Sequence, residues 1–183
     1  MKILSEVFTG KVVRLQLERH RLPDGRLADF EIVRHSGGAA VLPVLADGRV
    51  LLIRQYRAPL SGMLWEIPAG RLEPGEPPAA CVRRELREEA GYLAGRLEKL
   101  GEMLTAPGFC DEIVHLYLAT SLEPVPRALE ADEYIEPLPL PLAEAMAMLR
   151  RGEIIDGKTQ LALLLYSAGR EQEPDPSPAR WSE

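Results

Sequence analysis

The 183-residue chain has little of several features that would each indicate a particular class of protein. Its two cysteines, Cys81 and Cys110, lack CxxC spacing and are too few for a disulfide framework, so we expect a reducing, cytoplasmic location. No stretch reaches the roughly 20 apolar residues of a membrane-spanning helix. The opening MKILSEVFTG also lacks the apolar run of a secretory signal. We therefore expect no membrane partner.

Positive charge is scarce as well. Lys and Arg number 22 against 28 Asp and Glu, which gives a net charge of −6. Proteins that bind nucleic acid are usually basic, so we expect no nucleic-acid partner. An acidic protein can still act on a phosphate if a divalent cation lies between the two negative groups.

Two Asp-Gly pairs organise the first third of the chain. Alternating or continuously apolar segments flank each pair, a pattern that predicts a β-hairpin closed by a type I′ turn. The expected strands are 12–19 and 28–33 around Asp24-Gly25, and 39–45 and 50–56 around Asp47-Gly48. The second set is more continuously apolar, as expected for strands that are covered on both faces.

The rest of the chain predicts a mixed α/β domain. Prolines open the first expected helix and Gly91 ends it, while Asp156 is the expected N-cap of the last helix. The expected elements are a loop at 62–75, a helix at 79–90, strands at 97–104 and 113–119, a loop at 122–137, and helices at 141–151 and 157–168.

The helix at 79–90 carries an unusual number of carboxylates. Glu85 and Glu89 are four residues apart and share one side of the helix, with Glu88 beside them. Glu73 and Glu76 precede the helix in the loop. Three arginines of the same helix can offset the repulsion, so a solvated, ion-paired helix face is the alternative interpretation.

Three observations favour a metal site over a solvated face. The acidic positions border the apolar stripe of the helix, which directs them into a groove beside the sheet. The preceding Gly-Pro loop has backbone carbonyls that can act as oxygen ligands. Mg²⁺ and Mn²⁺ prefer oxygen ligands and commonly bridge protein carboxylates to substrate phosphate.

The spacing of this region resembles a known motif. It runs Gly70, five residues, Glu76, seven residues, and then Arg84-Glu85-Leu86-x-Glu88-Glu89-x-Gly91-Tyr92. This spacing resembles the Nudix box, GX5EX7REUXEEXGU with U apolar or aromatic, at every fixed position. The resemblance implies an α/β/α sandwich with a mixed central sheet, preceded by a small N-terminal β-hairpin unit. It also implies hydrolysis of a nucleoside diphosphate linked to another group.

The resemblance assigns metal ligands by position. Glu85 and Glu89 correspond to the main metal carboxylates and the carbonyl of Ala69 to a backbone ligand. Glu88 corresponds either to a further ligand or to a residue that supports the ligands. The implied cofactor is Mg²⁺, with Mn²⁺ as a substitute. We expect Arg84 to hold Glu76 or a neighbouring carboxylate in place instead of touching substrate.

The flanks of the box resemble the ADP-ribose pyrophosphatase subfamily. Pro107 stands sixteen positions after Gly91, as in that group, and the segments 54–57 and 64–70 are similar too. The implied reaction splits ADP-ribose into AMP and ribose 5-phosphate. By the same analogy Arg57 and Arg71 contact phosphate or ribose, Glu66 hydrogen-bonds adenine or ribose, and Pro107 belongs to the substrate site. A solvent-exposed charge at a strand edge is the alternative interpretation for Arg57.

In this subfamily a glutamate beyond the box is credited with activating the attacking water. The acidic loop at 129–136 lies in the corresponding region. Glu133 is our candidate, with Glu130, Asp132 and Glu136 as rivals, and an acidic solvated loop is the alternative interpretation.

The subfamily also implies a homodimer in which an N-terminal β unit is exchanged between subunits. We expect that unit at 1–36, the Nudix catalytic domain at 37–170 and a flexible, proline-rich tail at 171–183. Alternatives for the function are hydrolysis of another nucleoside diphosphate sugar such as GDP-mannose, isopentenyl diphosphate isomerisation, and a non-catalytic nucleotide-sugar sensor. The sensor is disfavoured because such proteins typically lose box carboxylates.

Overall fold

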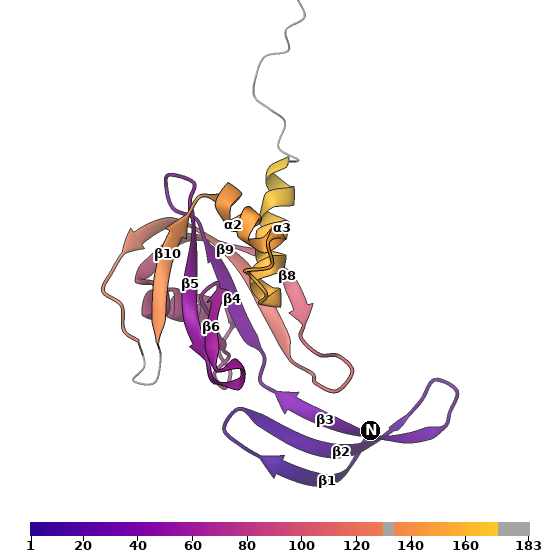
Figure 1. Ribbon diagram of the computed structural model, residues 1–183. Coiled ribbons are helices and arrows are strands. Elements are labelled where there is room, and N and C mark those ends of the chain that lie inside the picture. The colour runs from indigo at the N-terminus through magenta and orange to yellow at the C-terminus, as the bar shows by residue number, and fades with distance from the viewer. Residues whose placement is uncertain (130–133, 172–183) are drawn as a thin grey trace, which may run out of the picture.

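The N-terminal residues form a separate antiparallel sheet in the computed structural model, which describes residues 1–129 and 134–171 (Figure 1). Its strands β1 (Lys2–Thr9), β2 (Val13–Arg21) and β3 (Leu27–His35) pair in the order β1-β2-β3. The predicted pairing of β2 with β3 is confirmed. Strand β1 was not predicted, so the unit is a three-stranded sheet and not a simple hairpin.

The turn between β2 and β3 differs from the predicted type I′ turn. The Leu22 N–H donates to the Arg26 carbonyl at 2.8 Å, and the Gly25 N–H donates to the Leu22 carbonyl at 2.9 Å. Gly25 has a φ of +88°, whereas Asp24 has no positive φ. A type I′ turn requires two positive φ angles, so this three-residue loop with a left-handed glycine is the bulged alternative.

The second predicted hairpin is wrong in its pairing. Strands β4 (Gly38–Pro43) and β5 (Val50–Arg57) do flank a turn at Gly48, but they enter different sheets. An isolated antiparallel bridge between Val44 and Val50 joins them. The remaining strands are β6 (Gly62–Glu66), β7 (Ala69–Arg71), β8 (Tyr92–Leu104), β9 (Ile113–Pro124) and β10 (Ile135–Leu140). The first sheet has the order β7-β4-β9-β8 and the second β10-β5-β6, with β4 and β9 parallel.

Three strands lie in segments that the composition predicted to be loops. Strands β6 and β7 occupy much of the expected 62–75 loop, and β10 begins before the expected end of the 122–137 loop. Pro137 and Pro139 lie in β10 opposite Ile53 and Leu51 of β5. A proline cannot donate a backbone hydrogen bond, and β10 accommodates two of them because it is an edge strand.

The predicted helices are confirmed. Helix α1 (Pro78–Glu85) continues into the π-helical turn η2 (Leu86–Ala90), which ends at Gly91 with a φ of +76°. Helix α3 begins as predicted at its N-cap, where the Asp156 carboxylate accepts the Thr159 N–H at 3.0 Å. The other helices are η1 (Ala58–Leu60), α2 (Leu142–Arg150) and α3 (Gly157–Glu171).

The helices cover opposite sides of the sheets, which confirms the α/β/α sandwich. Alternate residues of β4 face opposite ways, so Ala40 and Leu42 pack with α2 and α3, whereas Ala39 and Val41 pack with α1 and η2. Helices α2 and α3 lie together on one side in Figure 1. No helix among the described residues is long and apolar enough to cross a membrane.

Candidate active site

Strand β7 and helix α1 bring Gly70 and Glu85 into direct contact. Glu85 is buried, and a Cβ on Gly70 would overlap its carboxylate. Gly70 pairs with Ala39 of β4, so the strand cannot move away without breaking the sheet. Glycine at this position therefore lets a helix carboxylate lie against the backbone of β7.

The next carboxylate of the helix also faces β7. Glu89 is 2% exposed, and its Oε2 accepts the backbone N–H of Ala69 at 2.9 Å. It lies in η2, and such π-helical turns within helices are frequent at functional sites. The structure thus brings together the predicted metal carboxylates Glu85 and Glu89 and the backbone of Ala69, all on the same strand–helix contact.

Arg84 lies at the centre of an acidic cluster. Its guanidinium donates to both carboxylate oxygens of Glu76 at 3.1 Å, to Glu85 at 2.5 Å and to Glu88 at 3.3 Å. The hydrogen bond from Arg84 holds the pKa of Glu76 below its ordinary value. The expectation that Arg84 holds neighbouring carboxylates is confirmed. We call Glu76, Arg84, Glu85, Glu88 and Glu89 the acidic cluster; it carries more carboxylates than cations.

These donors fit a hard divalent cation. They are oxygen atoms only, and two of the carboxylates are buried beside the carbonyl-bearing backbone of β7. Within residues 1–129 and 134–171, no three His, Cys, Asp or Glu side chains form a ready-made metal cluster. The donor set that the structure offers here combines the Glu85 and Glu89 carboxylates with the main chain at Ala69.

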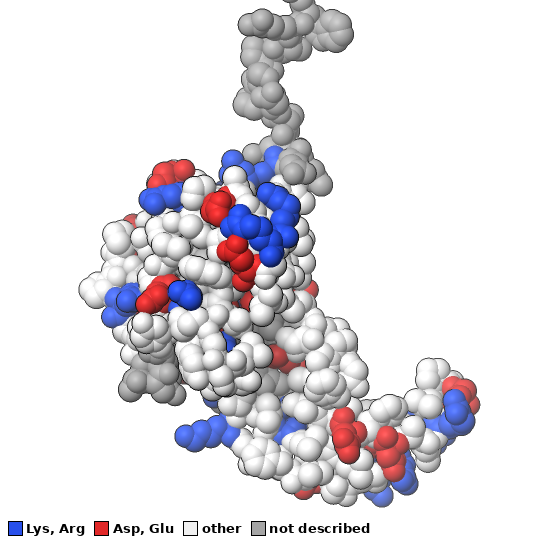
Figure 2. Space-filling model, in the orientation of Figure 1, with Lys and Arg blue, Asp and Glu red and all other residues white. Residues whose placement is uncertain are grey.

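An open pocket of about 610 Å³ lies beside the same strand. Both the N-terminal sheet and the part of the chain that follows it contribute to the pocket. Its lining includes the polar and charged residues His35, Arg57, Arg71, Thr105, Glu112 and Lys158. Figure 2 shows Lys and Arg interspersed with Asp and Glu on the visible face, so no broad field of one sign covers it.

A second ion-pair cluster borders this pocket. Glu66 is 1% exposed and accepts two hydrogen bonds from Arg57, at 2.7 Å each, and one from Lys158 at 2.5 Å. Lys158 also donates to Asp156 at 2.9 Å. Burial alone would raise the pKa of the Glu66 carboxyl, but Arg57 and Lys158 hold it below its ordinary value. We call Arg57, Glu66, Asp156 and Lys158 the balanced cluster.

Of the other predicted substrate residues, Arg71 lines the pocket and Pro107 does not. Arg71 is exposed, lines the pocket and donates to the Lys11 carbonyl of the N-terminal unit. Pro107 lies on an exposed turn between two lining residues, Thr105 and Glu112, and is not among the described residues that line the pocket.

The predicted water-activating residue, Glu133, lies outside the described residues, as do its rivals Glu130 and Asp132. Glu136 is described. It is exposed on β10 and accepts a hydrogen bond from the Tyr134 hydroxyl at 2.9 Å.

Lys158 is one of the pocket residues that sequence reasoning missed, along with His35, Thr105 and Glu112. It lies in the first turn of α3, where the helix dipole disfavours a cation. A lysine just after the predicted N-cap Asp156 was therefore a signal that a carboxylate or another anion lies nearby. The carboxylate is Glu66, 92 residues earlier in the chain.

Comparisons with known proteins show the family to which the chain belongs. The NUDIX domain matches residues 34–160. An ADP-ribose pyrophosphatase of Bacillus subtilis (strain 168) is 42% identical over 161 residues, covering 87% of each chain. A methanol dehydrogenase activator of Bacillus methanolicus is 41% identical with the same coverage. A GDP-mannose pyrophosphatase of Cronobacter sakazakii is 40% identical over 88% of this chain and 90% of that protein.

A solved structure shares the fold. The crystal structure of an ADP compounds hydrolase has a TM-score of 0.79, covers 93% of this chain and 95% of that one, and is 24% identical. The family match spans most of the chain, including both ion-pair clusters. The chain belongs to the Nudix family and is a Nudix hydrolase.

Proposed function

We propose that this chain hydrolyses the diphosphate bond of ADP-ribose to AMP and ribose 5-phosphate with the help of a divalent metal. One observation carries the proposal: strand β7 has the acidic cluster against it and also lines a pocket that holds Arg57, Arg71 and Lys158. A metal ion bound by the carboxylates and a diphosphate bound by the basic side chains would meet at this strand. The names of the relatives support a nucleoside diphosphate sugar as substrate.

We assign the metal site to Glu85, Glu89, Glu88 and the carbonyl of Ala69, with Mg²⁺ as the resident ion and Mn²⁺ as a substitute. Bound there, the metal would neutralise the diphosphate and polarise its phosphorus–oxygen bonds. Arg84 donates hydrogen bonds to the Glu85 and Glu88 carboxylates and so holds them in place.

The cationic side chains have a complementary role in this proposal. Arg57 is fixed by two hydrogen bonds to Glu66, and Lys158 is fixed by Glu66 and Asp156. Their remaining N–H groups can orient the phosphates, and Arg71 extends the same side of the pocket. Glu66 then acts on the substrate through these two cations, and we keep Pro107 as a substrate-side residue of the neighbouring turn.

We assign activation of the attacking water to Glu133. The change Glu133→Gln should lower kcat by about 10²-fold to 10⁴-fold, because a general base is lost while the binding groups remain. The KM should change little. Steady-state kinetics would show this, with Glu136→Gln measured alongside as the variant of a rival carboxylate. Near-normal turnover of Glu133→Gln would remove it as the base.

The N-terminal sheet supports a homodimer. Its apolar side chains Ile3, Val7, Phe8 and Leu27 are about half exposed, at 47, 60, 56 and 58%. Large exposed apolar groups on one small sheet are typical of an interface. We propose that residues 1–36 exchange between two subunits around catalytic domains formed by residues 37–170.

We also propose a cytoplasmic location. Cys81 and Cys110 are both free thiols, which suits a reducing cytoplasm.

The direct test is an assay of AMP and ribose 5-phosphate release from ADP-ribose with Mg²⁺. A GDP-mannose arm is included because one 40% identical relative is named for that substrate. We expect ADP-ribose to react faster, and EDTA to stop both reactions. Turnover of GDP-mannose without ADP-ribose would keep the metal chemistry and change the substrate. No turnover of either would contradict the proposal.

A further inference from the structure

The segment 105–112, which joins β8 to β9, is one side of the pocket but has little burial of its own. It contributes Thr105 and Glu112 to the lining. None of its eight residues is buried, and the Phe109 side chain is 57% exposed. Its position therefore depends on bonds to neighbouring elements more than on packing into the core.

The end of β3 supplies those bonds. The Val33 N–H donates to the Phe109 carbonyl at 2.7 Å, and the Asp111 N–H donates back to the Val33 carbonyl at 3.2 Å. The Asp111 carboxylate also accepts the His35 N–H at 2.8 Å. Three hydrogen bonds thus join a pocket segment of the catalytic half to the last strand of the N-terminal sheet.

Arg34 adds an ion-pair bridge at the same place. Its Nη1 donates to the second Asp111 carboxylate oxygen at 2.8 Å, while Nε and Nη2 donate to the two oxygens of Glu18 at 2.9 and 2.7 Å. Glu18 lies on β2 with its side chain 0% exposed, and its Oε2 is also 2.9 Å from His20 Nε2. A two-point bond fixes the guanidinium plane as well as its distance.

The two carboxylates that Arg34 joins differ in burial. A fully buried carboxylate is costly without a paired cation, so Glu18 and Arg34 stay together. The Asp111 side chain is 39% exposed and belongs to the unburied segment. The Glu18–Arg34 pair is therefore held in place, and Asp111 connects the segment 105–112 to that pair.

We propose that Arg34 is a positioning residue for substrate binding: it ties Asp111 to the buried Glu18 and so holds the Thr105–Glu112 side of the pocket against the N-terminal sheet. Arg34 acts through the segment and touches no reacting atom. This inference rests on the proposed function for its kinetic readout.

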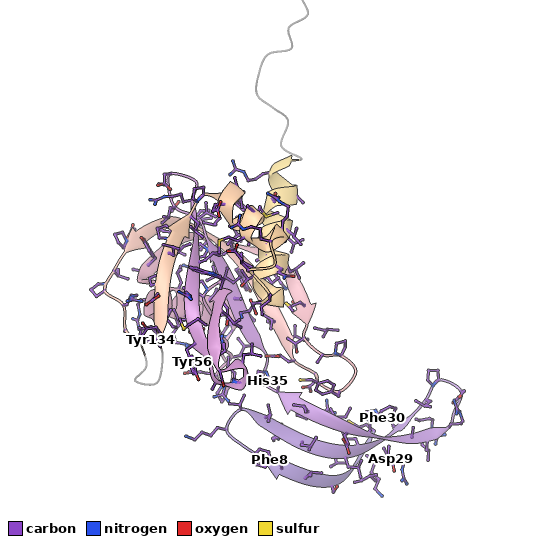
Figure 3. All side chains as sticks on the ribbon, in the orientation of Figure 1. Phe8, Asp29, Phe30, His35, Tyr56 and Tyr134 are labelled. Carbon is purple, nitrogen blue, oxygen red and sulfur yellow. The ribbon has the colours of Figure 1, made fainter. Side chains whose placement is uncertain are left out.

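The test compares two carboxylates that pair with arginines on the same sheet. Asp111→Ala removes the attachment point but leaves the Glu18–Arg34 pair intact. The matched control is Asp29→Ala, which breaks the two hydrogen bonds of 2.6 and 2.7 Å from Arg19. Figure 3 shows His35 where the N-terminal sheet meets the rest of the molecule, and Asp29 farther along that sheet.

We expect Asp111→Ala to raise the KM for ADP-ribose about 10-fold with kcat within about 2-fold, because a displaced pocket side weakens binding more than chemistry. Asp29→Ala should leave both constants unchanged. Asp111→Asn keeps an acceptor for the His35 N–H but loses the ion pair with Arg34, so its KM should also rise. A wild-type KM for this variant would mean that the His35 bond, and not Arg34, holds the segment. A purely structural role would lower the melting temperature without this division between KM and kcat.

Amide hydrogen exchange gives a second readout that needs no substrate. Asp111→Ala should speed exchange at the Val33 and Asp111 amides relative to Asp29→Ala. If wild-type protein fails to hydrolyse ADP-ribose, the proposed function fails and exchange alone decides the positioning role. An unchanged KM for Asp111→Ala in an active enzyme, or unchanged exchange in an inactive one, would overturn the inference.

Discussion

Two ion-pair clusters meet β7 and its pocket, and their charge balance differs. In the balanced cluster, Arg57 and Lys158 face Glu66 and Asp156, so cations and carboxylates are equal in number. In the acidic cluster, Arg84 contacts Glu76, Glu85 and Glu88. Arg87 also contacts Glu88 at 3.5 Å, and Glu89 adds a fourth carboxylate nearby.

The difference lies in net charge. Glu66 is almost completely buried, yet its pKa is lowered because two cations contact it. In the acidic cluster, four carboxylates outnumber the arginines that the structure places against them, Arg84 and Arg87. Close carboxylates repel unless a cation joins them, so this cluster is the one expected to take up a divalent metal.

The strongest way to break the comparison is to remove charge from the acidic cluster. Glu85→Gln and Glu89→Gln keep side-chain shape but should each lower kcat by about 10³-fold, as expected when charge stabilisation at the reacting phosphate is lost. Each should also weaken Mg²⁺ binding in a calorimetric titration. The control Glu153→Gln changes an exposed carboxylate paired with Arg151 and should be silent. Normal turnover and metal binding in both variants would refute the assignment.

A smaller effect is expected from Gly70→Ala. The new Cβ would overlap the Glu85 carboxylate, so this side chain must move away from β7. We expect kcat to fall by about 10²-fold, since a displacement near 1 Å can cost that much. Gly169→Ala is the matched control, because nothing lies within 4 Å of a Cβ there. Equal kcat values for the two variants would show that the close approach of Gly70 and Glu85 is not needed.

The local parts of this site could be predicted from the sequence. The box spacing places Glu85 and Glu89 one turn apart, and helix geometry alone then puts both on one side. The start of α3 at Asp156 and the end of η2 at Gly91 were also predicted, because capping depends on a few neighbouring residues.

The distant parts could not be predicted. Strand β10 contains Pro137 and Pro139, and only its pairing with β5 makes it a strand. Strands β4 and β5 likewise enter different sheets because β4 pairs with β7 and β9, whereas β5 pairs with β6 and β10. The salt bridge between Glu66 and Lys158 joins residues 92 positions apart, and no periodicity in the sequence reports such a contact. Tertiary pairing decided each of these features.

The smallest effect on activity is expected when one carboxylate charge is removed from the balanced cluster. Glu66→Gln leaves Arg57 and Lys158 with one carboxylate fewer and should destabilise the protein by about 3 kcal/mol, as breaking a buried ion pair does. The KM should rise only about 3-fold, because both cations remain at the pocket. Denaturant unfolding and steady-state kinetics would measure the two effects. Glu102→Gln, at an exposed pair with Lys99, is the control.

The pH dependence of this variant sharpens the comparison. The pKa of Glu66 is below its ordinary value in the folded protein, so its ionised form contributes stability above the unfolded pKa of about 4.3. That contribution is lost as pH falls through the folded pKa. The gap in unfolding free energy between wild type and Glu66→Gln should therefore be constant near pH 7 and narrow below about pH 4. A gap that stays constant to pH 3 would mean that Glu66 stabilises the fold by packing instead of charge.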